Sequence, residues 1–592
     1  MNIFKDRFSE IKKASEPLYK SPKSVQETIE ILKISESGIF EVADGKYSKT
    51  YRFSDVNYAT RSEDEQENFF QRYCKCLNSF DCTFKITVNN KNKDMDVLKN
   101  EVMLKYRNDG FDKMRESYNR IIEEKILEGR QGIEQERYLT ITIERKNFEE
   151  AKAQFATIEA SMFRSFAELG SKLTPLTGNE RLKILHDYYR LGREDEFNFE
   201  IKNGRITGTD FRNEICNTRI KYHPDYFEDE GKVGRVLFIK KYPTYLSDRF
   251  FTELTFLPVH SVTSVDVVPV PKDLTMKMLQ KKYLGIESDI IKQQRTRNRN
   301  NDFSSDISYA TRQKKKDIEE IMNNVRENDE SLYYVSVTMI VIADDRDELE
   351  SICETVDSIA KGAGCAVDTC MYKQREAVNT TLPIGVRQIE TMRTMLTQSL
   401  AVLMPFNVQE LCDRNGIYYG VNQISKNIIV GNRKKLLNGN GFIFGVSGAG
   451  KSFQAKMEMG SVLLSTDDNV IAVDPMNEYE DVTEKYNGTY INISTNTRNY
   501  INPMDMDVWN LDVLDSEGWV RDKCQFMLSI CEQIMKEITP QQRSIISRCV
   551  KDLYMDIARS REKYVPTMED LYNRLLEQED KEARDVALGL EI

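Results

Sequence analysis

The chain has 592 residues, a net charge of −11 and a charged fraction of 30%. Its length exceeds what a single hydrophobic core supports, so we expect about two to four domains. The negative charge argues against a protein that coats nucleic acid with its whole surface, and leaves room only for a local basic groove on an acidic body.

Cysteine usage and hydropathy place further limits on the class of protein. The cysteines are scattered from Cys74 to Cys549 without the paired spacing of a zinc knuckle, so we predict reduced thiols and no structural metal. The longest apolar run, Leu332–Ala343, is shorter than the roughly 20 residues that a membrane-spanning helix needs. We therefore predict that this run is a buried strand.

The N-terminal half alternates segments with strand and helix periodicity. Residues 1–50 predict a helical arm followed by a pair of strands, and residues 95–132 predict a long charged helix. A strand at 137–145 leads at once into a helix, and the same order returns from residue 332 onward. Because a helix that connects strands must cover one face of a sheet, we expect two α+β modules.

Residues 281–328 contain few large apolar clusters and predict a helical hairpin with a polar tip near Asn300–Ser305. Within residues 292–316, eight basic residues stand against two acidic ones. Two interpretations stay open: a solvated projection, or a contact with an acidic protein partner, lipid headgroups or nucleic acid.

The composition changes near residue 405, where we place a domain boundary. The segment "GFIFGVSGAGKS" carries the spacing G-x-x-x-x-G-K-S between Gly445 and Ser452, after an apolar strand and before an amphipathic helix. Glycines at these positions let several backbone N–H groups converge on one phosphate at a helix N-terminus. Lys451 is placed to reach the β- and γ-phosphates, and the Ser452 hydroxyl to ligate Mg²⁺.

A second apolar strand, Val470–Val473, ends at Asp474. This acid either holds the water shell of a metal or caps the turn that follows, and the sequence leaves both roles open. No later apolar strand ends in an Asp-Glu pair, and the chain has helical periodicity from Ser516 onward. The predicted nucleotide-binding residues are Gly445, Ser447, Gly448, Ala449, Gly450, Lys451, Ser452, Phe453 and Asp474, with Ser452 as the metal ligand.

Several segments in order resemble one protein family. They are "GVSGAGKSF", "VIAVDPMNEYEDV", "YINPMDM" and "ITPQQRSIISRCVKDLY" in the second half, and "YRFSDVNYATRSEDEQENFFQRYCKCLNSFD" in the first. Together they are similar to the VirB-type conjugal-transfer ATPases of type IV secretion systems, within the HerA–FtsK superfamily. The basic hairpin is most like the versions carried by integrative conjugative elements of Gram-positive bacteria.

The resemblance implies a mixed α/β and α+β architecture. Residues 1–405 would form N-terminal α+β platform modules, and residues 406–592 an incomplete RecA-like P-loop ATPase domain. It also implies ATP and Mg²⁺ as cofactors, a hexamer at full length, membrane channel subunits as partners, and contact with DNA. The location it implies is the cytoplasmic face of the membrane, at the transfer channel.

Family members continue past the point where this chain stops, through a Walker B strand and an arginine that completes a neighbour's site. The resemblance therefore implies a C-terminally truncated chain, with its catalytic residues unassigned and ATP hydrolysis by this chain an open question. Two hypotheses remain: an ATP-driven component of conjugal transfer, and a non-catalytic scaffold that docks to channel proteins while nucleotide only orders its fold.

Overall fold

The computed structural model divides the chain into two compact units, Met1–Ile471 and Ala472–Ile592. The expected N-terminal helical arm and the expected hairpin tip near Asn300–Ser305 lie outside the described residues. Placement is described for residues 22–591 except 23, 93–101, 129–132, 192, 194–195, 200, 202–204, 207–209, 217–218, 244, 300–308, 328, 414, 495–496, 498, 507–515 and 561–563.

The first unit contains a β-α-β-β-α-β module that has a helix inserted between its second and third strands. The sheet order β6-β3-β5-β4, with every neighbour antiparallel, is the order of a ferredoxin-like split β-α-β unit. Its elements are β3 (Lys46–Phe53), α2 (Glu63–Asn78), β4 (Thr83–Asn92), β5 (Ile133–Glu144), α5 (Phe148–Leu169) and β6 (Leu173–Pro175), and the inserted helix is α4 (Asp112–Glu128).

A second module repeats this topology. Its sheet order β11-β12-β10-β13 is again antiparallel throughout, and its insertion also stands between the second and third strands. Its elements are β10 (Lys232–Lys241), α8 (Arg249–Thr255), β11 (Ser261–Val270), β12 (Leu332–Ala343), α11 (Arg346–Gly362) and β13 (Ala366–Thr369), and the insertion consists of α9 (Lys272–Arg299) and α10 (Tyr309–Glu327).

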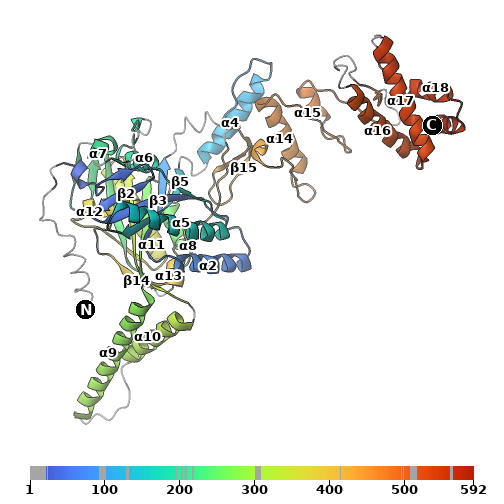
Figure 1. Cartoon of the computed structure of the whole chain (residues 1–592). Helices are drawn as coiled ribbons and strands as arrows, with labels where there is room; N and C mark the ends of the chain where they lie inside the picture. The colour runs from blue at the N-terminus through green and yellow to red at the C-terminus, as the bar shows by residue number, and fades with distance from the viewer. Residues whose placement is uncertain are drawn as a thin grey trace. The chain divides into compact units, whose positions relative to one another are not determined.

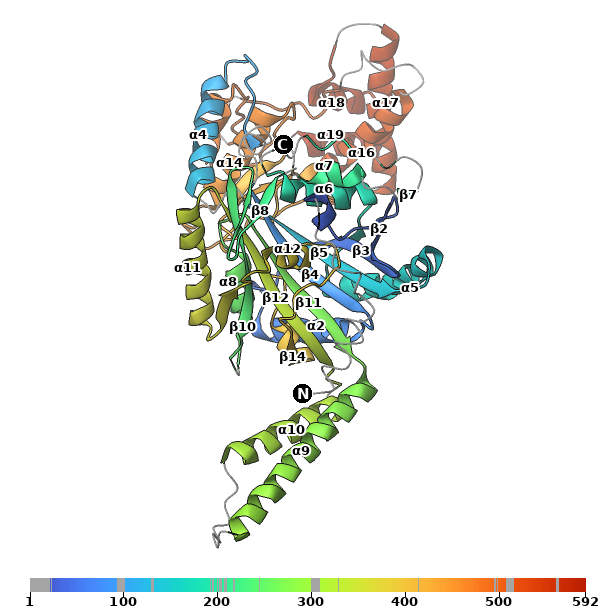
Figure 2. The same ribbon diagram turned by 90° about the vertical axis from the view of Figure 1, so that its left-hand side faces the viewer.

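The two modules share one sheet of twelve strands. β4 of the first pairs with β11 of the second, in a register that runs from Ser261↔Asn90 to Val267↔Phe84. Because β4 and β11 are antiparallel, their C-terminal ends lie at opposite ends of the sheet, and the two helical insertions leave from these opposite ends. Figures 1 and 2 show the α9–α10 hairpin projecting from one of them.

Both insertions start and finish at residues that face each other across a strand pair. Asn92 at the end of β4 pairs with Ile133 at the start of β5. Val270 at the end of β11 pairs in the same way with Leu332 at the start of β12. Each insertion therefore takes the place of a hairpin turn, and the sheet register does not depend on it.

Helices cover both faces of the sheet, which explains the continuous apolar run of β12. Val335, Val337 and Val341 point into a core beneath α2, α5, α8 and α11, whereas Ile340 and Ile342 point into a second core on the opposite face. A strand buried on both faces lacks the usual alternation of apolar and polar residues. The predicted buried strand at Leu332–Ala343 is confirmed.

On the second face, buried polar side chains hold the segment Thr380–Arg387 against the sheet. Lys85 is fully buried and donates to the carbonyls of Thr380 and Val386, the latter at 3.1 Å. Burial lowers the pKa of Lys85 to about 8. Gly385 adopts a φ of +97° here, and an added Cβ would lie 2.6 Å from the Cβ of Ser48, so only glycine fits.

The remaining elements complete this unit. Four of them, β2 (Ile39–Ala43), β8 (Ile220–Tyr222), β9 (Phe227–Asp229) and β14 (Arg393–Leu396), complete the twelve-stranded sheet. Those around it are η1 (Gln26–Thr28), the strand pair β1 (Ile34–Ser35) and β7 (Arg205–Ile206), α6 (Gly178–Tyr189), α7 (Asp210–Ile215), α12 (Gln374–Thr381) and α13 (Thr397–Ala401). Those near the glycine-rich loop are β15 (Ile417–Val421), β16 (Ile428–Gly431), η3 (Arg433–Lys435) and α14 (Lys451–Ser465).

The second unit is helical, as the periodicity from Ser516 onward predicts. Its four longest helices pack around one apolar core that includes Met527, Ile546 and Leu571. Its helices are α15 (Glu480–Lys485), α16 (Ser516–Met535), α17 (Pro540–Ser560), α18 (Met568–Leu576) and α19 (Lys581–Leu590). In the described part of the chain, none of the helices has both the length and the hydropathy of a membrane span.

Candidate phosphate-binding site

The glycine-rich loop turns directly into the N-terminus of α14. Gly448 and Gly450 have φ values of +80° and +87°, which favour glycine, and Gly450 is the N-cap residue of the helix. The turn is closed by the amide of Ala449, which donates to the Val446 carbonyl at 3.2 Å. No acidic residue stands in the first turn of α14. The helix N-terminus therefore presents backbone N–H groups and a positive dipole end to an anion.

Lys451 folds back over this loop. Its ammonium donates to the carbonyls of Gly445 and Val446 at 2.9 and 3.0 Å. An added Cβ on Gly445 would lie 3.3 Å from the Lys451 Cγ, so this glycine leaves room for the lysine stem. The Lys451 ammonium therefore lies against the glycine-rich loop, within hydrogen-bonding distance of two of its carbonyls.

The predicted site residues fall into two groups in the structure. Gly445 to Gly450 form the exposed loop, and Lys451, Ser452 and Phe453 form the first turn of α14. Asp474 belongs to the second compact unit, whereas all the others belong to the first. The structure therefore brings eight of the nine predicted residues together on one loop and helix, and their contact with nucleotide stays a prediction.

Asp474 caps its own turn. Its carboxylate accepts the backbone N–H groups of Met476, Glu478 and Tyr479 at 3.1, 2.6 and 2.9 Å. Partial desolvation opposes the charged form, but these amide donors outweigh it and hold the pKa of Asp474 below its usual range. This geometry favours the capping role that the sequence left open beside metal binding.

The middle of α14 is fixed by an ion pair from the residues before the loop. Arg433 lies 2.8 Å from the carboxylate of Glu458, and its Nε donates to the Tyr419 hydroxyl at 3.0 Å. That hydroxyl donates in turn to Glu458 at 2.9 Å. These contacts tie η3 and β15 to the side of the helix that follows the loop.

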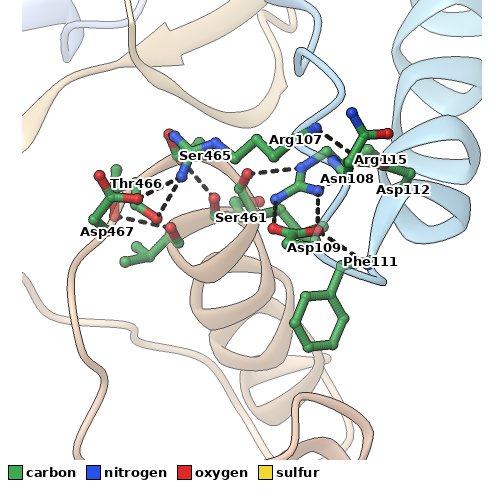
Figure 3. Close-up of polar contacts among 12 residues, drawn as sticks. Arg107, Asn108, Asp109, Phe111, Asp112, Arg115, Ser461, Ser465, Thr466 and Asp467 are labelled. Atoms are coloured by element: carbon green, nitrogen blue, oxygen red, sulfur yellow. Dashed lines mark hydrogen bonds and ion pairs between the residues drawn. The ribbon is translucent and has the colours of Figure 1, made fainter.

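The C-terminal end of α14 is held by α4 and the residues that precede it (Figure 3). Arg107 donates to the Ser465 carbonyl at 2.7 Å and pairs with Asp467 at 2.6 Å. Arg115 is completely buried and donates through Nε to the Leu464 carbonyl at 3.1 Å. Both arginines thus satisfy carbonyls that the end of a helix leaves without partners.

The expected strands at Gly441–Gly445 and Val470–Val473 are not formed as hydrogen-bonded strands, and this prediction was wrong. Phe442 and Phe444 are 82% and 87% exposed, and Ile471 and Val473 are 93% and 94% exposed. A strand exists only when a neighbour pairs with its backbone, and the described residues offer no such neighbour to either segment. Each of these segments therefore leaves large apolar side chains exposed to solvent.

One known family model matches the region around the glycine-rich loop. Residues 413–586 match the family model of the TraG P-loop domain. The TraG-like segment contains all nine predicted site residues, begins close to the expected boundary at about 405, and supports a relation to conjugal-transfer P-loop ATPases. No curated protein matches the chain.

The TraG-like segment implies nucleotide binding, and the loop fits a phosphate. The fit rests on the two glycines at positive φ, on the helix N-terminus that follows them, and on the Lys451 ammonium against the loop. Among the described residues, no group of three or more His, Cys, Asp or Glu side chains is arranged to hold a metal ion. The domain boundary stays a prediction, since the compact units divide after Ile471.

Sequence reasoning missed the contribution of the segment around α4. Arg107 and Arg115 lie about 350 residues before the carbonyls that they bind, so no local motif connects them to the loop. The one local signal was the spacing of Asp112 and Arg115, which stand three residues apart and therefore lie side by side on a helix.

Proposed function

We propose that this chain is the nucleotide-binding component of a conjugative type IV secretion machine, in which ATP energises channel assembly and the transfer of DNA or protein. The proposal rests on one observation above the others: the TraG-like match covers a glycine loop whose backbone and lysine have the geometry for phosphate. The resemblance of residues 1–405 to the platform of VirB-type ATPases supports it.

In this proposal, ATP lies with its phosphates at the N-terminus of α14. The loop N–H groups from Gly448 to Lys451 would bind the phosphate oxygens, and Lys451 would exchange its two loop carbonyls for the β- and γ-phosphates. The Ser452 hydroxyl would ligate Mg²⁺, which neutralises phosphate charge when bound. The partners would be membrane channel subunits and further copies of the chain in a hexamer at the cytoplasmic face of the membrane, with DNA as cargo.

The capping role of Asp474 favours a second candidate. A carboxylate that already accepts three amides has less capacity to order a metal's water shell. The second candidate is an assembly scaffold that docks to channel proteins and binds nucleotide without turning it over. The two candidates share the phosphate loop and differ in hydrolysis.

One experiment separates the two candidates. ATP binding and phosphate release are measured on the purified 592-residue chain, with its mass in solution recorded at the same time. Lys451→Ala removes the loop lysine, and Lys456→Ala removes the same charge farther along α14 as a matched control. We expect wild type and Lys456→Ala to bind ATP, and Lys451→Ala to lose at least about tenfold in affinity.

Each result has a defined meaning. Turnover that Lys451→Ala abolishes supports the motor, and binding without turnover supports the scaffold. Equal ATP affinity in wild type and Lys451→Ala would overturn both candidates, because both place the phosphates at this loop.

A further inference from the structure

The helical insertion of the first module, residues 102–128, is a separate arm that packs beside α14. The two helices lie next to each other in both views of the molecule (Figures 1 and 2). Val102, Tyr118, Ile122 and Ile126 form a small core with Ile428 and Val430 of β16. This core is distinct from the two cores of the large sheet.

Arg115 is the polar centre of the arm. Two carboxylates bracket it: Asp109 accepts from both Nη atoms at 2.6 Å, and Asp112 accepts from Nη1 at 2.8 Å. Hydrogen bonding to Arg115 holds the pKa of Asp109 well below its usual range. The Nε atom is thereby left in a fixed direction, toward the Leu464 carbonyl. An arginine held on two sides orients its third donor rigidly.

The arm is also rigid within itself. Asn119 exchanges two hydrogen bonds with the backbone of Leu104, at 2.8 and 2.9 Å. Asp112, the first residue of α4, accepts the amides of Arg107 and Asn108 and so ties the preceding turn to the helix. Arg107 and Arg115 therefore approach the last turn of α14 as parts of one body.

α14 connects this contact to the phosphate loop. It starts at Lys451 and ends at Ser465, so it spans about 22 Å. The phosphates would bind at its N-terminus, whereas the arm binds the carbonyls at its C-terminus. A helix of this length moves as a rigid body, so the position of one end fixes the position of the other.

From this arrangement we propose that the arm positions the phosphate loop, and that Arg115 is a positioning residue for nucleotide binding. The inference rests on the proposed nucleotide binding and adds to it a coupling between nucleotide and platform. By linkage, if docking of the arm favours nucleotide binding by some factor, nucleotide favours docking of the arm by the same factor.

The topology supplies a matched control for the arm. The second module carries its own insertion at the equivalent place, but that hairpin leaves from the opposite end of the sheet. Removing either insertion leaves a strand pair whose ends already face each other. Removal of the arm also removes contacts to α14, whereas removal of the α9–α10 hairpin does not.

The test uses the full chain and four variants. Arg115→Met keeps the bulk of the side chain without its donors, and Arg115→Lys keeps the charge without the three-sided geometry. An arm deletion joins Asn92 to Ile133 by a short turn, and the matched hairpin variant replaces residues 280–324 by a short Gly-Ser linker. The affinity for a fluorescent ATP analogue is measured, together with amide hydrogen exchange of residues 102–126 with and without nucleotide.

We expect Arg115→Met and the arm deletion to weaken the analogue about tenfold, and Arg115→Lys to weaken it less. The hairpin variant should bind like wild type. In wild type, saturating nucleotide should slow exchange in the arm as well as in the loop, and Arg115→Met should abolish the effect in the arm. If the role of Arg115 were only structural, Arg115→Met would lower thermal stability, and wild type would show no nucleotide-dependent slowing of exchange in the arm.

Failure of the inference differs from failure of the proposed function. Unchanged exchange in the arm while the loop amides are protected would overturn the inference alone. Absence of any analogue binding or loop protection in wild type would instead overturn the proposed function. If Arg115→Met does not fold, amide exchange in the arm of wild type, with and without nucleotide, still tests the inference.

Discussion

At the scale of single residues, one buried histidine makes the stability of the folded protein depend on pH. The Nε2 atom of His260 is buried and has no hydrogen-bond partner in the described structure. Burial, together with the positive charges of Lys91 and Lys232, lowers the pKa of His260 from 6.5 to about 4. The folded protein therefore keeps this imidazole neutral where the unfolded chain binds a proton.

This difference predicts a loss of stability in mild acid. The contribution of His260 is fully present above pH 6.5 and is lost as the pH falls toward 4, because only the unfolded state takes up the proton between these values. We expect the free energy of unfolding to fall by about 2 kcal/mol more in wild type than in His260→Gln, between about pH 7.5 and about pH 5. Urea unfolding at both pH values measures it; parallel changes in the two proteins would contradict the assignment.

The glycine-rich loop was the part of the site that the sequence predicted best. The loop spacing placed Gly448, Gly450 and Lys451 correctly on a turn and the start of a helix, because phosphate-loop geometry is local in sequence. The role of Asp474 stayed open because a capping acid and a metal-binding acid look alike in a sequence. The role of Arg115 could not be predicted, because the carbonyl that it binds belongs to Leu464, 349 residues later in the sequence.

At the scale of elements, the α9–α10 hairpin is independent of the sheet that carries it. The strands on either side of it, β11 and β12, pair with each other up to Val270↔Leu332 and do not depend on the hairpin for this pairing. We expect replacement of residues 280–324 by a short Gly-Ser linker to shift the unfolding temperature by only about 2–4 °C, while the helical circular dichroism falls. A loss of cooperative unfolding would show that the hairpin stabilises the sheet.

Elements with strong local signals were predicted, and the pairing of strands that lie far apart in the sequence was not. The helix expected directly after the strand at 137–145 is α5, which has an asparagine N-cap and a glycine C-cap. The strands expected at Gly441–Gly445 and Val470–Val473 were wrong, because an apolar run becomes a strand only when another strand pairs with it. The union of both modules in one sheet depends on the β4–β11 pairing, whose partners lie far apart in sequence.

At the scale of the whole molecule, charge is divided unequally. Residues 292–316 carry a net charge of +6, within a chain whose total is −11. α9 is about 42 Å long, several times the screening length of about 10 Å at 0.1 M salt. The acidic body is therefore too distant to neutralise this charge, and the hairpin's own acids Glu287 and Glu319 pair with Lys315 alone among the described ion pairs of residues 309–316.

This separation predicts binding to polyanions by a protein that is acidic overall. We expect wild type to be retained on heparin at low salt and eluted by moderate salt, and the chain with residues 280–324 replaced to pass through. Affinity chromatography over a salt gradient measures the difference. Equal elution of the two proteins would show that the basic residues are neutralised within the fold.

The paired strand ends have a further consequence for the free-energy cost of each insertion. The ends of each insertion are held together by the ladder, so a longer insertion adds only a loop-closure entropy that grows with the logarithm of its length, about 0.6 kcal/mol for each doubling. Each module thus carries its insertion at little cost to the pairing of its strands. In this chain one module carries the arm on α14, and the other carries a basic hairpin at the opposite end of the sheet.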